Sequence, residues 1–373
     1  LTVGGTAVTG TYSFEVDGTL VEFAATVPTD TNDTIAAGLR ADATTELASL
    51  GITVSGATNQ IILTGPLGVT FVVDQETAPG TGTLTAVETT AAVSIATGLD
   101  AIVAEQNDWY GLALVSRAKQ TILNAAAWTE GNGSKLYIAQ SSDADILTAA
   151  TDDIASLLQD LNYTRTALLY FPTDSVRADA AWAGNRLAAD LDVRQTAWYN
   201  ATLTGVSTSA TNISNTAKTN ALAKNANLYL TLQGGGATGG GKVASGLYID
   251  EITTIDWVIA RAREAIAQLF LNVSNALAKI PYTDEGFAQI GSVVQPVLER
   301  GLRANHFALS ANGEPPVVIL PLLADVDSAD RANRLYRFSF AALLSSGIRE
   351  VVVSGSVTND NDAFEALVAS LEV

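Results

Sequence analysis

The sequence predicts a multi-domain protein of mixed α/β and α+β class. Short apolar strands alternate with helices over the middle of the chain, which predicts a central α/β sheet domain. Two long amphipathic segments between Gly246 and His306, followed by strands, predict a C-terminal domain of a helix pair and β-structure. Thr-rich alternating segments at the start predict a small β-rich module of the insertion type. We therefore expect domains over residues 1–90, 91–232 and 233–373 of the 373-residue chain.

Residues 1–90 predict a ββαββ module. Alternating segments flank Asp17-Gly18, and Asp-Gly in that setting is the strongest short signal for a β-hairpin. A helix should follow, with Asp30 or Asn32 as its N-cap. Its expected apolar face is formed by Ile35, Leu39, Leu47 and Leu50. Strands are expected after it over 52–56, 59–65 and 68–74. The module is interpreted as a binding module or a surface decoration.

Residues 91–232 predict a doubly wound, largely parallel sheet with helices on both faces. The expected strands are 110–116, 135–140, 166–172 and 227–232, and the expected helices lie around 117–129, 144–161, 175–191 and 213–224. A dinucleotide-binding fold needs G-x-G-x-x-G directly after its first strand. Residues 117–120 read RAKQ instead, so the sheet carries no nucleotide signature there.

The glycine-rich segment 234–241 reads GGGATGGG and precedes Lys242. From Gly236 it matches a P-loop except at its last position, where Val243 replaces the Ser or Thr that binds Mg²⁺. We therefore interpret it as a flexible surface loop and expect no cofactor.

The C-terminal domain begins with a long helix whose apolar residues recur at 3-4-3-4 spacing, which predicts one stripe facing one partner surface. The stripe is Ile252, Ile255, Ile259, Ala262, Ile266, Leu269 and Val273. A second helix should begin after the N-cap Thr283, be kinked at Pro296, and bury Phe287, Ile290, Val294 and Val297. Strands are expected within 315–326, 334–344 and 349–358, with a short helix near 364–371.

Composition excludes several function classes. The chain has no Cys, one His and no Met, so thiolate chemistry is excluded and a zinc site lacks ligands; we expect no catalytic, cofactor-binding or metal residues. His306 is expected at a loop or helix end without a chemical role. The net charge of −19 argues against nucleic-acid binding. The sequence has no run of 18 apolar residues, so we expect no membrane span. Because the start lacks Met and a signal peptide, we expect an internal portion of a longer product.

Five segments of the C-terminal part occur in a fixed order: GLYIDEITTIDWV (246–258), AKIPYTDEGFAQI (278–290), PPVVILPL (315–322), ADRANRLYRFSF (329–340) and REVVVSGSV (349–357). In this order and combination they resemble a bacteriophage contractile tail sheath protein. The resemblance covers roughly residues 220–357, whereas residues 91–220 are similar in pattern only.

This resemblance implies a structural, non-enzymatic virion subunit, assembled in the host cytoplasm. It would polymerise with itself as stacked hexameric rings around a tail tube protein, contact baseplate and tail terminator proteins, and contract to drive genome delivery. Sheaths of this kind join by strands exchanged between neighbours through terminal arms. We expect the strand containing Val351, Val353 and Val357 to take part in that exchange.

Positive charge is concentrated near the C-terminus of an otherwise acidic chain. Arg331, Arg334 and Arg337 lie in one short segment, and Arg300, Arg303 and Arg349 add to them. Two interpretations stay open: salt bridges to local acids, or a basic inner face that docks on an acidic tube or a neighbouring subunit.

Two other functions are weighed from the sequence. An α/β-fold hydrolase or transferase would rely on a carboxylate pair, because the chain has one His and no Cys. A carbohydrate-binding module in residues 1–90 would need exposed aromatic rings, and the candidates there are Tyr12, Phe14, Phe23 and Phe71.

Overall fold

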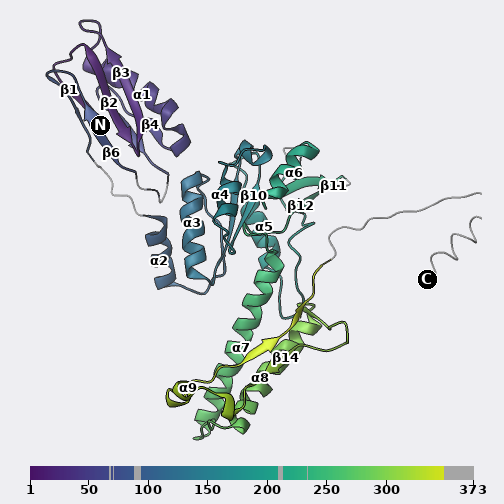
Figure 1. Cartoon of the computed structure of the whole chain (residues 1–373). Coiled ribbons are helices and arrows are strands. Elements are labelled where there is room, and N and C mark those ends of the chain that lie inside the picture. The colour runs from purple at the N-terminus through teal and green to yellow at the C-terminus, as the bar shows by residue number, and fades with distance from the viewer. Residues whose placement is uncertain (67–68, 70, 88–93, 209–212, 233, 348–373) are drawn as a thin grey trace, which may run out of the picture.

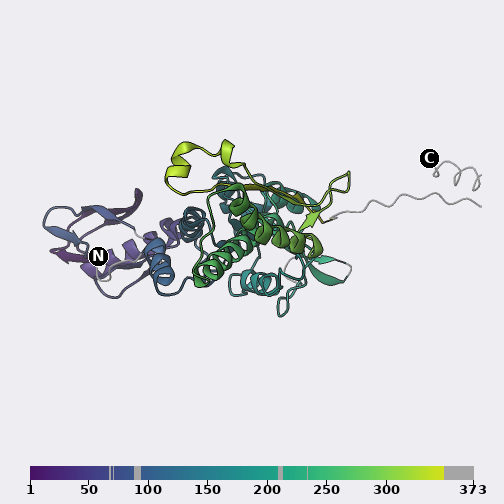
Figure 2. The same ribbon diagram turned by 90° about the horizontal axis from the view of Figure 1, so that it is seen from below.

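The computed structural model describes residues 1–66, 69, 71–87, 94–208, 213–232 and 234–347. An N-terminal module, a five-stranded sheet with its helices and a projecting helix pair follow one another along the chain (Figures 1 and 2). The mixed α/β class is confirmed. The division at residues 90 and 232 stays a prediction.

The N-terminal module packs one helix, α1 (Asn32–Glu46), against short antiparallel strands. Strands β2 and β3 form the expected hairpin, and Asp17 and Gly18 both adopt positive φ, 48° and 80°, as its turn requires. The strands are β1 (Thr2–Gly5), β2 (Gly10–Val16), β3 (Thr19–Ala25), β4 (Thr53–Ser55), β5 (Ile62–Thr64), β6 (Val73–Thr77) and β7 (Gly82–Thr85).

Three details of the module differ from the sequence expectations. The N-cap of α1 is Thr31, whose hydroxyl accepts from the Thr34 amide, and not Asp30 or Asn32. The pair β1–β7 was not expected, and the strand expected over 68–74 starts only at Val73. Tyr12 and Phe14 are fully buried, so their rings cannot stack on a sugar.

The central sheet has four parallel strands in chain order and an antiparallel edge strand, with order β12-β11-β10-β9-β8. They are β8 (Gly111–Leu112), β9 (Leu136–Ser141), β10 (Thr166–Tyr170), β11 (Asn227–Leu232) and β12 (Gly235–Gly239). The largely parallel sheet is confirmed, but the doubly wound topology is wrong because the strand order never reverses. The described sheet therefore lacks the switch point at which open α/β folds bind ligands.

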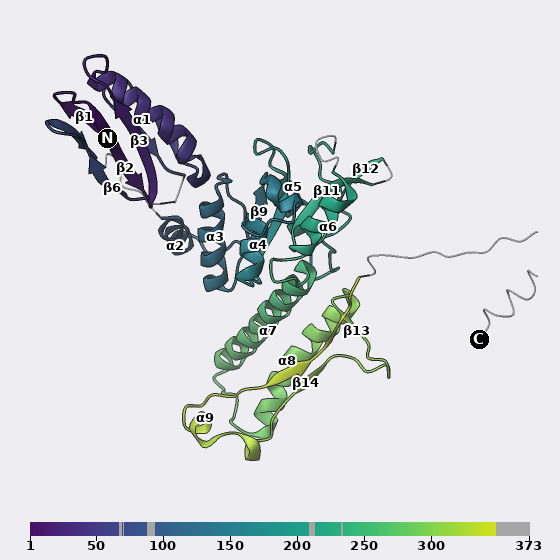
Figure 3. The ribbon, with the colours of Figure 1, turned by 45° about the horizontal axis from the view of Figure 1, so that its top comes forward.

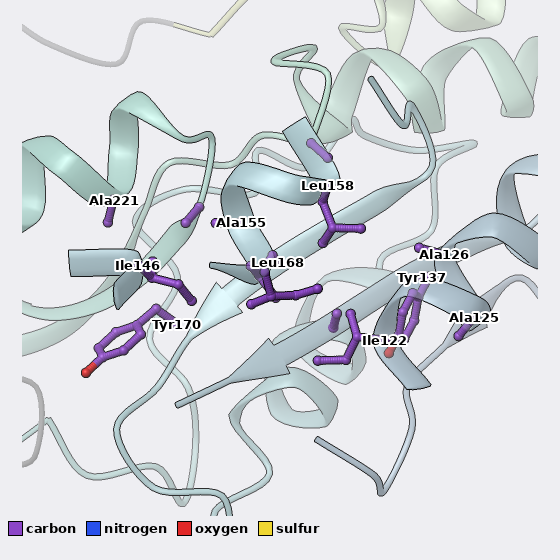
Figure 4. Close-up of a cluster of buried hydrophobic side chains, with 14 of the residues drawn as sticks. Ile122, Ala125, Ala126, Tyr137, Ile146, Ala155, Leu158, Leu168, Tyr170 and Ala221 are labelled. Carbon is purple, nitrogen blue, oxygen red and sulfur yellow. The ribbon is translucent and has the colours of Figure 1, made fainter. Parts of the chain in front are cut away.

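Helices cover both faces of the sheet, as expected. Helices α3 (Lys119–Asn132), α4 (Ile154–Asp160) and α6 (Asn215–Ala223) pack on one face. They share a face because parallel strands added in one direction by right-handed crossovers leave their helices on the same side. Figure 4 shows Ile122 and Leu158 from this layer beside Leu168 of β10. Helix α5 (Ala178–Leu187) packs on the other face, where Trp182 and Trp198 are buried.

Two helices of this region depart from the expected pattern. The helix expected over 144–161 is two elements, a 3-10 turn η2 (Ala144–Leu147) and α4, because Asp143 and Asp153 each cap a separate start. Helix α2 (Ile95–Glu105) was not expected; it packs beside α3.

The glycine-rich segment is strand β12 rather than a flexible loop. A Cβ on Gly236 would lie 2.0 Å from the Tyr229 hydroxyl, and one on Gly240 would lie 2.5 Å from Asn227 Oδ1. The Asn227 side chain also accepts from the amides of Gly241 and Lys242, at 2.6 and 2.9 Å. The glycines thus allow close packing on β11, and two of the amides after β12 are engaged by Asn227 rather than free for a phosphate.

The C-terminal part contains the expected pair of long helices, α7 (Ile249–Asn275) and α8 (Asp284–Arg303), which lie side by side (Figure 3). Thr283 caps α8, Pro296 lies inside it, and the four residues expected on its apolar face are buried. The remaining elements are β13 (Phe307–Ala308), β14 (Val317–Ile319), η3 (Leu323–Asp325), α9 (Ser328–Ala332), β15 (Ser339–Ala341) and β16 (Leu343–Leu344). The strand expected over 349–358 and the helix near 364–371 lie outside the described residues.

Candidate assembly interface

Helix α7 connects the central sheet to the helix pair and projects well beyond the sheet (Figures 1 and 3). Its first residue, Ile249, is buried in the core on one face of the sheet. Glu251 accepts from the Tyr248 amide at 3.2 Å, which fixes the start of the helix. The contacts that hold this first stretch of α7 therefore set the direction in which the whole helix projects.

One set of contacts joins α7 to the sheet through Asp256. Its two carboxylate oxygens accept from the Arg165 guanidinium at 2.8 Å each, and the Tyr110 hydroxyl donates to it at 2.6 Å. Arg165 precedes β10 and Tyr110 precedes β8. Burial and the neighbouring Asp256 charge raise the pKa of Tyr110, so its hydroxyl stays protonated and donates. We call these three residues the Asp256 network.

A second set of contacts joins α7 to the loop after α5 and to the end of α8. His306 is fully buried and stacks on Trp257, with ring centroids 4.5 Å apart. Its Nε2 lies 2.7 Å from the Leu191 carbonyl oxygen and its Nδ1 lies 2.9 Å from the Thr254 hydroxyl. Because a carbonyl oxygen only accepts, Nε2 carries the proton and Nδ1 accepts from Thr254. His306 thus follows α8, at the expected place, and fastens three segments together.

Asp192 completes this junction. The Trp257 indole donates to it at 2.9 Å, and the Arg300 and Arg261 guanidinium groups lie 3.4 and 3.5 Å from it. Burial opposes its ionisation, but the Trp257 hydrogen bond and the two arginines outweigh burial and lower the pKa of Asp192. Arg300 is therefore part of an ion pair within the chain. This agrees with the interpretation that the C-terminal arginines form salt bridges to local acids.

Beyond these contacts, α7 leaves apolar side chains in solvent. Its buried face is formed by Ile252, Thr254, Trp257 and Val258, whereas Ile255 and Ile259 are 45% and 38% exposed. Within this chain the expected seam therefore faces the core at Ile252 but not at Ile255 and Ile259, and its later residues, Ala262, Ile266, Leu269 and Val273, are half-buried. The helix end continues the pattern, because Phe270 and Leu271 are 52% and 58% exposed.

Residues 265–278 at this end contain no Asp, Glu, Lys or Arg. Large apolar side chains such as Phe270 and Leu271, exposed in an uncharged stretch, are typical of a surface that another chain covers. We call Ile255, Ile259, Phe270 and Leu271 the α7 apolar surface.

The arginines near α9 lie on the surface. Arg331 and Arg334 are exposed and have no ion pair within the part of the chain that the structure describes. Arg337 is exposed as well, and its Nε lies 2.9 Å from Asp330. Tyr336 anchors the segment by stacking on Phe287 of α8. The segment thus presents positive charge beside a fixed aromatic anchor, and its role as an interface stays a prediction.

Two short two-stranded sheets lie along the helix pair. Within the described ranges, β14 pairs with β15 alone and β13 with β16 alone, so each sheet has open edges there. Open edges accept further strands. Val351, Val353 and Val357, which the sequence predicts for such a strand, lie outside the described residues.

The described ranges hold neither a candidate metal site nor a candidate membrane span. No group of three or more His, Asp or Glu side chains there is placed to hold a metal ion. No helix in those ranges is long and apolar enough to cross a membrane.

The sequence by itself matches no protein-family model and no curated protein. The structure, however, resembles a chain of the PVC sheath complex, an extracellular contractile injection system in its contracted state. The TM-score is 0.52 at 13% identity, over 73% of this chain and 76% of that chain. This chain has the fold of a contractile sheath subunit.

Two further structures resemble this chain. The contracted helical sheath of the anti-feeding prophage aligns with a TM-score of 0.51 at 13% identity, over 71% of this chain and 74% of that chain. A chain of the anti-feeding prophage baseplate aligns with a TM-score of 0.54 at 12% identity, over 70% and 72%. The resemblance predicted from the order of sequence segments is therefore confirmed at the level of the fold.

The Asp256 network generates a stability prediction. Asp256→Asn leaves the Arg165 guanidinium, which is only 16% exposed, without its counter-charge. We expect the free energy of unfolding to fall by about 2–4 kcal/mol, because removing one partner of a largely buried pair strands the other. Denaturant titration measures this. The matched control, Asp160→Asn on the exposed end of α4, should change it by less than about 0.5 kcal/mol. Equal effects of the two substitutions would contradict this role.

His306 generates a pH prediction. Burial lowers its pKa, more than the Leu191 carbonyl and Asp192 raise it, so the folded state favours the neutral ring. Its contribution to stability is therefore complete above the unfolded pKa of about 6.5 and is lost as pH falls below it. The loss is about 1.4 kcal/mol per unit by which the pKa is lowered.

The measurement compares the wild type with His306→Gln in urea titrations between about pH 8 and 5. The gap in unfolding free energy between the two proteins should narrow as the pH falls. A gap that stays constant over this range would show that His306 is not held neutral.

Proposed function

We propose that this chain is a structural, non-enzymatic subunit of a contractile sheath, which polymerises with copies of itself into a helical sheath and associates with a baseplate. The observation that carries the proposal is the shared fold with contracted sheath subunits, with TM-scores of 0.52 and 0.51. In its finer form, the assembly is a phage tail in which hexameric rings surround a tail tube and end at baseplate and terminator proteins. That form rests on the resemblance of the C-terminal segments.

The α7 apolar surface supports self-assembly. Covering these four exposed side chains in a polymer removes apolar area from water, which stabilises the contact by about 25 cal/mol per Å². Its position on a projection held by the Asp256 network and the His306 junction lets one subunit reach past its own sheet. The net charge of −19, in contrast, opposes non-specific clustering.

Strand exchange is the proposed connection between subunits. The open edges of the β14–β15 and β13–β16 sheets give main-chain donors and acceptors to an incoming strand. We assign that strand to Val351–Val357 of a neighbouring copy. Main-chain hydrogen bonds of this kind persist while the attached bodies rotate, which suits a polymer that shortens.

The α7 apolar surface generates an assembly prediction. Phe270→Glu places a charge on the exposed end of α7, where the side chain is already 52% exposed. The monomer should keep its stability within about 0.5 kcal/mol, whereas polymerisation, followed by sedimentation and electron microscopy, should fail.

The matched control is Leu161→Glu, an equally exposed apolar residue, 50%, at the end of α4. It should polymerise as the wild type does. Normal polymers of Phe270→Glu, or failure of both variants, would contradict a specific role for α7.

The arginine segment generates a second assembly prediction. Charge reversal at Arg331 and Arg334 should block polymerisation or tube docking and leave circular dichroism and thermal unfolding unchanged, because both side chains are exposed. Arg194→Glu is a control on another exposed arginine. Normal sheath formation by the double variant around its tube would refute the docking role and leave local ion pairing as the function of these residues.

A further inference from the structure

One half-buried arginine of the central domain has no carboxylate partner within the part of the chain that the structure describes. Arg186, near the end of α5, makes one weak hydrogen bond, 3.4 Å from Nη2 to the Tyr199 carbonyl oxygen. Its Nε is buried and has no acceptor. Every other described arginine that is not fully exposed contacts a carboxylate or, for Arg40, two carbonyl oxygens. Among the described residues, Arg186 is therefore a cation without a counter-charge.

Burial of such a group is unfavourable unless something offsets it. The desolvation of Arg186 lowers its pKa, and no nearby carboxylate raises it again. A partly buried charge without a partner destabilises the fold, whereas a carboxylate beside it would accept two parallel hydrogen bonds from the guanidinium. The side chain thus has unused capacity for an anion.

Arg186 lines a small cavity that is otherwise mostly apolar. The cavity has a volume of about 220 Å³, and its walls include Leu187, Leu191, Trp198, Tyr110 and Thr253. A phosphate or nucleotide would lose too much hydration against such walls. A carboxylate on a short apolar stem fits both the volume and the chemistry: the stem meets the leucines and the tryptophan, and the charge meets Arg186.

We propose that the Arg186 cavity is a binding site for a carboxylate carried on a short apolar stem. The source is either a free small carboxylate or an acidic side chain from another copy of this chain, which carries 39 acidic residues. The site lies at the start of α7, because Thr253 belongs to that helix and Tyr110 bonds Asp256. An occupant therefore contacts Tyr110 of the Asp256 network and Thr253 of α7.

The test uses butyrate as the probe and butyramide, its neutral counterpart, as the control. Ligand-observed NMR and thermal unfolding of the unassembled wild-type chain should show saturable binding of butyrate and not of butyramide. Arg186→Gln should weaken butyrate binding roughly 10-fold or more, since it removes a charge-assisted hydrogen-bond pair. Arg186→Lys keeps the charge and should retain part of the binding, and Arg263→Gln, an exposed arginine, should retain all of it.

Assembled protein distinguishes the two sources. If a neighbour's side chain fills the site, the polymer no longer binds butyrate; if the ligand is a free carboxylate, the polymer binds it as the monomer does. Equal binding of butyrate and butyramide, absence of saturable binding, or unchanged binding in Arg186→Gln would each overturn the proposal. If a variant fails to fold, the comparison of butyrate and butyramide binding to the wild type still tests the proposal.

Discussion

The ion pair between Asp256 and Arg165 is the interaction on which the rest of the structure depends. It joins the sheet to α7 through two 2.8 Å hydrogen bonds, and Tyr110 adds a third contact from the start of β8, two strands away from β10. A bidentate pair fixes orientation as well as distance. Because α7 continues for several turns beyond this point, a small rotation at its start would move its far end by many ångströms. His306 and Asp192 hold the opposite side of the same stretch, so the projection is rigid at its base.

Because α7 is held rigidly at its base, the apolar side chains exposed further along the helix have fixed positions. A helix held at one end presents Ile259 and Phe270 in a fixed direction, so little conformational entropy of this helix is lost when a partner docks on them. The open edges of the β14–β15 and β13–β16 sheets lie along the same helix pair. A rigid helix pair that carries exposed apolar side chains and open sheet edges is suited to repeated contacts between identical subunits. The sheath fold shared with injection-system proteins agrees with that division of roles.

Local signals predicted local structure well. The Asp17-Gly18 turn and the Thr283 cap act within a few residues, and both occur where the sequence placed them. The Arg165–Asp256 pair could not be found in this way, because 91 residues separate its members and each resembles any exposed charge. The periodicity of α7 identified an amphipathic helix but not which partner its stripe faces. The core of this chain takes Ile252 of the expected stripe together with Trp257 and Thr254, and it leaves Ile255 and Ile259 partly exposed. The glycines of 234–241 were read as flexibility although they serve close packing on Tyr229 and Asn227.

The central claim is that copies of this chain cover the exposed side of α7 in a helical polymer. Cryo-electron microscopy of the assembled wild-type protein tests it most directly. The account predicts tubes or stacked rings in which Ile255, Ile259 and Phe270 are buried against a neighbouring copy. Tubes that leave these side chains in solvent, or a protein that remains monomeric at every concentration at which it is soluble, would contradict it.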